Sequence, residues 1–272
     1  MKESCETIRL DPAPAQAVSE TVEERREAVP LAHEAIHETV ARVLKAQTKR
    51  GLLLDVPAGE GALAARLRRA DFDVRCCDLY PEIFRLPGVE IKRGDLSGEL
   101  PYADESFQFI TCVEGLEHIE NPQQAIREFS RLLCAGGHLI VTVPNILNIE
   151  ERVKWLLNGY TSHFKPISRE ALARVREQLG GMEEVALHIN PISYAELRYT
   201  LEKYNFEIER LYRDKPKRHL WLYWPLVAAI RLLARFTPAH KRRERWTREL
   251  QSDEILLGGN TLIVHAIKQS GT

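Results

Sequence analysis

The sequence predicts an α/β fold in which helices cover both faces of a doubly wound, mainly parallel sheet. A short apolar run at 52–56 is followed by a turn with Gly59 and Gly61 and then by leucines at helical spacing. Short apolar runs alternate with helical patterns up to residue 143, as in parallel strands joined by crossover helices. A chain of 272 residues can bury the core of such a sheet in one domain with elaborations.

The individual elements follow from local patterns. Apolar residues from Leu31 to Ala46 share one helical face, so a helix should precede the first strand. The first strand begins with an apolar run, as expected for burial on both faces, and the glycines after it let a ligand approach the backbone. Residues 122–133 predict an amphipathic helix capped by Gly136 and Gly137. We expect strands at 52–56, 73–78, 89–93, 107–113, 138–143, 206–211 and 261–267.

Two long, mostly helical stretches interrupt this pattern after residue 145. The first separates the fifth and sixth strands by far more than a crossover needs, and it should lie at the carboxyl edge of the sheet. The second precedes the last strand. The expected organisation is a mobile N-terminal segment (1–30), a domain built from 31–145 and 186–270, a substrate-cap insertion (146–185) and an apolar and basic helical insertion (214–258).

The composition is ordinary for a soluble globular protein, but charge is unevenly distributed. The whole chain has a net charge of −1, whereas the stretch from Arg213 to Leu250 has eleven lysines and arginines against three acidic residues. Such a block favours an anionic partner, either a membrane or a nucleic acid. The five cysteines form no CxxC pair, which favours buried, reduced thiols. The N-terminus lacks the apolar core of an export signal, so we expect a cytoplasmic protein.

Three aspartates follow the first three predicted strands. Asp55, Asp78 and Asp95 would project over one crevice of a doubly wound sheet. Asp78 comes seventeen residues after Gly61, which suits a carboxylate that accepts both hydroxyls of a ribose, and Asp95 could accept a hydrogen bond from an adenine amine. Each aspartate taken singly could equally cap a turn or a helix. Together they predict a nucleoside site whose acidic surroundings suit a cationic ligand and disfavour pyrophosphate.

Several segments of the sequence resemble the class I S-adenosylmethionine-dependent methyltransferases. They are Leu53-Leu54-Asp55-Val56-Pro57-Ala58-Gly59-Glu60-Gly61, Asp78, and residues 94–96, 100–107, 117–119 and 131–145. The resemblance covers 50–145 well, and 186–212 and 260–268 loosely. Pro57 stands where the family has its first glycine, and Gln108 replaces a common acidic residue. The resemblance implies a Rossmann-like, seven-stranded sheet with an antiparallel last strand, and S-adenosylmethionine as cofactor. It also implies a cofactor site made of Asp55, Pro57, Ala58, Gly59, Gly61, Asp78, Leu79, Asp95, Leu96 and Glu114.

The segment after the fourth strand carries the candidate catalytic chemistry. Glu114, Glu117 and His118 have a spacing that resembles the Glu-x-x-Glu-His site of metal-dependent O-methyltransferases, including ubiquinone-type and small-RNA 2′-O-methyltransferases. Two carboxylates and an imidazole can hold a divalent cation such as Mg²⁺, with His188 or His163 as a further ligand. Alternatively, Glu117 and His118 start a helix and line a substrate loop without a metal. His188 is then a base, a residue that positions the acceptor, or a loop histidine.

The second insertion predicts a surface contact. Residues 220–230 are apolar and aromatic, and at eleven residues they are too short to span a bilayer. Arg231, Arg235 and the basic run 241–246 follow, which suits a helix that lies in a membrane interface. The same pattern suits a helical hairpin packed on its own domain or on a dimer partner. The aromatic residues lie in an apolar block rather than among the basic residues, which disfavours nucleic acid.

We therefore expect a methyltransferase that transfers a methyl group from S-adenosylmethionine to an oxygen of a small-molecule, glycan or lipid-linked acceptor at the cytoplasmic membrane face. A nucleotide-linked dehydrogenase would need three spaced glycines at the start of its phosphate-binding helix, and Pro57 disfavours this. A catalytically silent methyltransferase-like adaptor for a membrane or protein partner is disfavoured by the intact cofactor residues.

Overall fold

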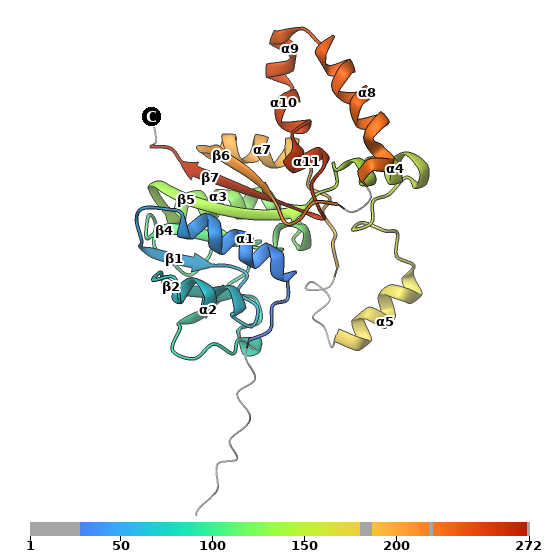
Figure 1. Ribbon diagram of the computed structural model, residues 1–272. Helices are drawn as coiled ribbons and strands as arrows, with labels where there is room; N and C mark the ends of the chain where they lie inside the picture. Colours follow the sequence, from blue (N-terminus) through green and yellow to red (C-terminus); the bar gives the residue numbers. More distant parts are fainter. Residues whose placement is uncertain (1–27, 180–186, 218–219, 271–272) are drawn as a thin grey trace, which may run out of the picture.

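A seven-stranded sheet runs through the centre of the protein in the order β3-β2-β1-β4-β5-β7-β6 (Figure 1). The computed structural model describes residues 28–179, 187–217 and 220–270, so nearly all of the predicted N-terminal segment lies outside the described residues. The first five strands are parallel, and the last strand is antiparallel to both of its neighbours, which confirms the predicted sheet. The strands are β1 (Leu52–Asp55), β2 (Asp73–Asp78), β3 (Ile91–Arg93), β4 (Phe107–Cys112), β5 (Leu133–Pro144), β6 (Phe206–Arg213) and β7 (Thr261–Lys268).

Helices cover both faces of this sheet (Figure 1). On one face, α1 (Glu34–Lys45) and α2 (Ala62–Arg68) bury Val40, Leu44 and Leu67 against β1, β2 and β4. On the other face, α3 (Pro122–Leu132) and α7 (Tyr194–Lys203) pack against β4 and β5. The predicted apolar faces of α1 and α3 are the buried ones, so the 3.6-residue periodicity located both helices.

The predicted glycine cap after α3 is wrong. α3 ends at Leu132, and β5 begins at the next residue and contains both Gly136 and Gly137. Leu133 pairs with Phe107 and His138 pairs with Phe109, so β5 accommodates extra residues opposite one short piece of β4. Gly136 has a φ of +74° within this bulge. A glycine pair permits either a helix end or a bulged strand, and here the strand pairing decides between them.

Both long insertions leave the sheet at its carboxyl edge. The first contains α4 (Ile149–Asn158) and α5 (Arg169–Leu179). The second contains η3 (Leu220–Tyr223), α8 (Trp224–Arg235), α9 (Ala239–Glu244), α10 (Thr247–Leu250) and α11 (Asp253–Leu256). Figure 1 shows α8 and α9 projecting from the domain, with the base of α8 beside α4. Every described helix is too short or too polar to cross a bilayer.

Candidate functional site

A cavity of about 650 Å³ opens at the carboxyl edge of the parallel strands. Its walls come from the ends of β1 to β4, from residues 29–37, from the loops that carry His163 and His188, and from the two ends of the second insertion. Gly61 is not among the lining residues and instead forms the N-cap of α2. All the other predicted cofactor residues line this cavity: Asp55, Pro57, Ala58, Gly59, Asp78, Leu79, Asp95, Leu96 and Glu114.

The glycine turn after β1 is fastened to the end of β2. The Gly59 N–H donates to the Asp78 carboxylate at 2.8 Å, and the Tyr80 N–H donates to its other oxygen at 2.9 Å. A carboxylate oxygen can accept more than one hydrogen bond, so Asp78 can anchor the turn and still accept from a ligand in the cavity. The turn-anchoring and ligand-binding interpretations of this aspartate are therefore compatible.

Both glycines of the turn are required by the backbone and by close packing. Gly59 has a φ of +53° and Gly61 a φ of +93°, a region that favours glycine. A Cβ at Gly59 would lie 2.9 Å from the Leu31 side chain, and one at Gly61 would lie 2.7 Å from the Phe84 ring. The turn is therefore covered by the chain segment that precedes α1, and this segment forms part of the cavity wall.

Pro57 links this turn to the loop after β4. A Cβ at Gly115 would lie 2.7 Å from Pro57 Cδ, so proline and glycine fit against each other. Gln108, the other departure from the family pattern, accepts the Leu52 N–H at 2.8 Å through its side-chain oxygen. The two unusual residues therefore have packing and hydrogen-bonding roles at either end of β1.

Asp55 is buried at the end of β1 and holds a proton unusually tightly. Its Oδ1 accepts the Thr111 hydroxyl at 2.7 Å, whereas its Oδ2 has no hydrogen-bond partner among the described residues. Burial raises the pKa of Asp55 from 3.8 to about 7; the Thr111 hydroxyl opposes this shift and the nearby Asp78 adds to it. Asp55 therefore binds a proton far more tightly than an exposed aspartate does.

Asp95 follows β3 and lies at the edge of the cavity. Its Oδ1 accepts the Ser97 N–H at 2.7 Å, which closes a turn. The neighbouring Leu96 is buried and also lines the cavity. This places a carboxylate and an apolar side chain together at the third strand end, the pair expected to face an adenine ring.

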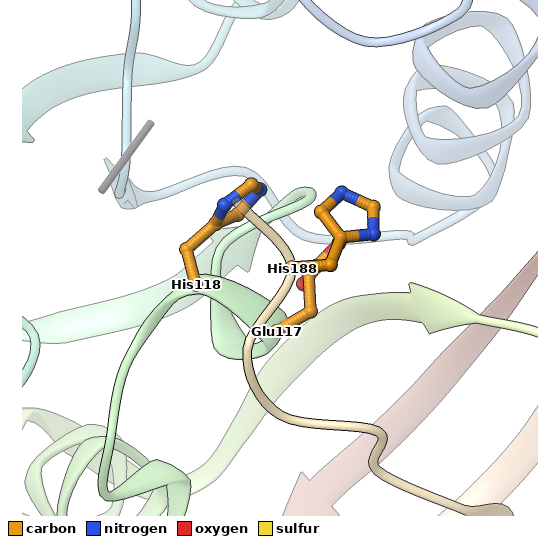
Figure 2. Close-up of side chains that lie close together, drawn as sticks. All are labelled: Glu117, His118 and His188. Carbon is orange, nitrogen blue, oxygen red and sulfur yellow. The ribbon is translucent and has the colours of Figure 1, made fainter. Parts of the chain in front are cut away.

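Glu117, His118 and His188 converge beside the cavity (Figure 2). One oxygen or nitrogen atom from each lies within 4.8 Å of those of the other two. Glu117 and His118 belong to the short helix η2 (Leu116–His118), and His188 belongs to the segment before α7. The Ile189 N–H donates to the Glu117 carbonyl at 2.9 Å, which holds the two segments together. Three of the four predicted metal ligands thus meet, although seventy residues separate His118 from His188.

The protonation of this cluster follows from burial. Burial and the neighbouring Glu114 raise the pKa of Glu117 well above its ordinary value, so the Glu117 carboxyl holds its proton more tightly than an exposed carboxyl does. Burial, then the nearby His118 and His163, lower the pKa of His188 to about 4, so this imidazole is neutral. His118 Nδ1 lies 3.0 Å from the Leu187 carbonyl oxygen, an acceptor, so Nδ1 carries a hydrogen.

The unpaired atoms of the cluster fit a cation. Both carboxyl oxygens of Glu117 and Nδ1 of His188 are buried without a hydrogen-bond partner among the described residues. Buried polar atoms without partners are rare in native proteins and call for an explanation such as an ion. A carboxylate and two neutral imidazoles are the ligand types that divalent transition metals prefer.

Glu114 lies next to this cluster but is held elsewhere. Its backbone has a φ of +50°, and its N–H donates to Thr142 Oγ1 at 2.9 Å. The Thr142 hydroxyl donates back to the Glu114 carboxylate at 3.2 Å. Burial raises the pKa of Glu114. The side chain therefore belongs to the cavity wall rather than to the group of three.

Three further contributions complete the site, and of these the sequence indicated only His163, as an alternative metal ligand. The His163 ring stacks on the His188 ring with centroids 5.9 Å apart, and Phe164 packs beside them. The buried Glu151 on α4 accepts the Ser162 N–H at 2.6 Å and holds this loop in place. Asp214, at the end of β6, lines the cavity with Oδ1 buried and without a hydrogen-bond partner among the described residues.

Comparison with known proteins identifies the family of this chain. A family model described as a methyltransferase domain matches residues 24–211. The ubiquinone biosynthesis O-methyltransferase of Aliivibrio fischeri (strain MJ11) is 27% identical over 161 residues, covering 52% of this chain and 69% of that protein. The enzyme of the same name from Xanthomonas euvesicatoria is 33% identical over 140 residues, covering 44% of this chain and 57% of that protein.

The fold is shared with solved methyltransferases at low sequence identity. A SAM-dependent methyltransferase from Archaeoglobus fulgidus matches with a TM-score of 0.54 at 11% identity, covering 87% of this chain and 95% of that one. One from Thermotoga maritima matches with a TM-score of 0.51 at 18% identity, covering 86% of this chain and 89% of that one. The chain belongs to the methyltransferase-domain family and is a class I enzyme that uses S-adenosylmethionine.

Proposed function

We propose that this enzyme methylates a hydroxyl oxygen of a small-molecule acceptor and that Glu117, His118 and His188 bind a divalent cation for this reaction. The convergence of these three side chains within 4.8 Å beside the cofactor cavity carries the proposal. Methyl transfer is an in-line displacement at the sulfonium carbon, so the protein must mainly hold the nucleophile close, aligned and shielded from water. A hydroxyl must also lose its proton to become a good nucleophile.

The side chains alone supply little basicity. An imidazole with a pKa of about 4 is a weak base at neutral pH, and burial makes the Glu117 carboxyl hold its own proton more tightly than an exposed carboxyl does. Both features suit ligation, because a metal binds the neutral imidazole and displaces the carboxyl proton. A bound divalent cation would supply Lewis-acid activation, which lowers the pKa of the acceptor hydroxyl.

The remaining groups hold this set in place. The hydrogen bond from His118 Nδ1 to the Leu187 carbonyl fixes the orientation of the imidazole ring, as such bonds do for histidines that bind metals. The stacked His163 ring restricts the rotation of His188. One carboxylate and two imidazoles suit Mn²⁺, Fe²⁺ or Zn²⁺ better than Mg²⁺, the cation considered from the sequence.

Within this class of reaction, we propose a lipid-linked acceptor that is met at the cytoplasmic face of a membrane. Two relatives carry names from ubiquinone biosynthesis, which is consistent with an apolar acceptor bearing a ring hydroxyl. The apolar second insertion also supports this proposal, because both of its ends line the cavity at Asp214, Lys215, Asn260 and Thr261. An acceptor carried in by this insertion would arrive beside the cation ligands.

The metal proposal can be tested directly by Mn²⁺ titration of chelator-treated protein, followed by electron paramagnetic resonance. We expect the wild type to bind Mn²⁺ and Glu117→Gln to bind it at least about tenfold more weakly, because second-shell losses alone reach that size. Glu120→Gln is the matched control, since Glu120 lines the cavity close to the cluster in sequence but is exposed and outside it. Equal Mn²⁺ binding by wild type and Glu117→Gln would contradict the proposal.

Activity provides the second test. Transfer of a labelled methyl group from S-adenosylmethionine to simple catechols should fall on chelation and return with Mn²⁺. Glu117→Gln should lose this restoration while still binding the cofactor in calorimetry. Full activity in the presence of chelator would show that the cluster acts without a cation.

A further inference from the structure

Large exposed apolar side chains gather on two helices that are distant in the sequence. On α4, Leu156 and its neighbours at the helix end face solvent, and Leu156 is 82% exposed. On α8 and at its ends, Leu233 and Phe236 are 68% and 77% exposed. The set, called here the apolar face, consists of Trp155, Leu156, Leu157, Trp221, Leu222, Trp224, Leu226, Leu232, Leu233 and Phe236.

The first turns of the two helices are joined by a small core. Ile149 on α4, Val227 on α8 and Leu256 on α11 pack together and are fully or almost fully buried. Figure 1 shows the base of α8 beside α4, with the rest of α8 projecting from the domain. Val227 is the buried residue of α8 and Ile230 packs beside it on this core, whereas Leu226, Leu232 and Leu233 are exposed. An exposed apolar area of this extent marks an interaction site.

Exposed basic side chains lie alongside this face. They are Arg235, Lys241, Arg242, Arg243, Arg245 and Arg248. None of the six forms an ion pair with a described acidic residue, whereas Arg231, on the covered side of α8, pairs with Asp253 at 2.7 Å. Apolar and aromatic residues bordered by unpaired arginines match an anionic lipid surface, in which rings enter the interface and cations contact the headgroups.

We propose that the apolar face and its basic border dock the enzyme on an anionic lipid bilayer. The helices are too short to span a membrane, so docking places them in the plane of the interface. A second copy of the chain fits this surface poorly, because a two-fold symmetric contact would bring two basic borders together.

Docking would bring the bilayer to the acceptor side of the cavity. His163 lies on the loop that follows α4, and Asp214 and Thr261 flank the insertion that contains α8; all three residues line the cavity. The same two segments therefore carry the apolar face and wall the cavity. A lipid-linked substrate would then enter the cavity without leaving the bilayer. The identity of this substrate rests on the proposed function.

Vesicle co-sedimentation of the full chain tests the docking. We expect binding to vesicles of phosphatidylglycerol and phosphatidylcholine in equal parts, and much weaker binding to phosphatidylcholine alone. The double variants Leu156→Gln/Leu157→Gln on α4 and Leu233→Gln/Phe236→Gln on α8 should each reduce the bound fraction about tenfold. Arg242→Gln/Arg243→Gln should reduce binding only to the anionic vesicles, as added salt does.

Tyr199→Gln is the matched control, because Tyr199 is 58% exposed on α7, outside the apolar face. Its binding should equal that of the wild type. Absence of wild-type binding to anionic vesicles would overturn the proposal. So would a concentration-dependent dimer that the α8 variant abolishes, since a second copy would then occupy the face.

Different measurements test the proposed function and the membrane docking, so either proposal can be refuted without the other. Glu117→Gln should still bind vesicles if docking is correct, whatever its activity. The α4 and α8 variants should retain turnover of a water-soluble catechol, and they should lose turnover only of an acceptor embedded in vesicles.

Discussion

The buried carboxyl of Asp55 makes the stability of this protein depend on pH in a way that one substitution can isolate. Asp55→Asn keeps the size of the side chain and an oxygen that can accept the Thr111 hydroxyl, now 2.7 Å away, but removes the titration. The pKa of Asp55 is raised by burial to about 7 in the folded protein and returns to 3.8 on unfolding.

The size of the effect follows from these two values. Because the folded-state pKa is the higher one, the native state binds the proton more tightly, and the free energy of unfolding falls as pH rises through this interval. A pKa difference of about 3 units corresponds to about 4 kcal/mol, lost between about pH 4 and pH 8. The variant has no such loss, so its stability relative to wild type should rise by about 4 kcal/mol over the same range.

Urea denaturation at pH 4, 6 and 8 measures this difference. All other titrating groups are common to the two proteins, so their contributions largely cancel when wild type and variant are compared at each pH. The difference in urea midpoint between the variant and the wild type should change mainly below pH 7 and level off above it. A stability difference that stays constant with pH would show that Asp55 titrates normally and would refute the burial argument.

Three other substitutions test neighbouring parts of the site. Asp78→Asn should weaken S-adenosylmethionine binding about ten- to a hundredfold in calorimetry, because a charged hydrogen-bond acceptor is lost. The control is Asp73→Asn, which should bind S-adenosylmethionine as the wild type does, because Asp73 is exposed at the other end of β2. Glu151→Gln should cost about 3 kcal/mol in urea denaturation, because the buried Glu151 carboxylate loses the charge that pairs with the half-buried Lys154 and accepts the Ser162 N–H. Glu150→Gln should cost under about 1 kcal/mol. Glu117→Gln should become more stable than wild type as pH rises. The raised folded-state pKa of Glu117 makes the free energy of unfolding of the wild type fall with pH, whereas glutamine imitates the protonated carboxyl and does not titrate. Urea denaturation that gives both proteins the same dependence on pH would contradict this.

Local patterns were sufficient to locate the sheet. Apolar runs and helical periodicity placed β2 at 73–78 as observed and the other strands to within a few residues, except β5, which starts five residues earlier because the bulge at Gly136 belongs to the strand. The strand positions also predicted where the glycine turn and the aspartates at the strand ends would lie, since parallel strands end at one edge of the sheet.

The rest of the site depends on contacts that spacing cannot determine. Glu114 fits the ligand spacing, yet its positive φ and Thr142 on β5 keep it outside the cation cluster. His188 lies in this cluster because the next residue, Ile189, donates a backbone hydrogen bond to the Glu117 carbonyl. In the same way, the apolar run at 220–230 predicted a surface helix, but only the fold shows that it joins α4.

The buried carboxyls at this edge of the sheet would respond to the charge of a bound cofactor. Burial raises the pKa of Asp55 and Glu114, which line the cavity, and of Glu117 beside it, so all three hold a proton more tightly than exposed carboxyls do. A sulfonium in the cavity would lower these pKa values, because a nearby positive charge favours the ionised form. Methyl transfer leaves a neutral thioether, so this effect would end with the reaction, and the same carboxyls would distinguish the cofactor from its product by charge.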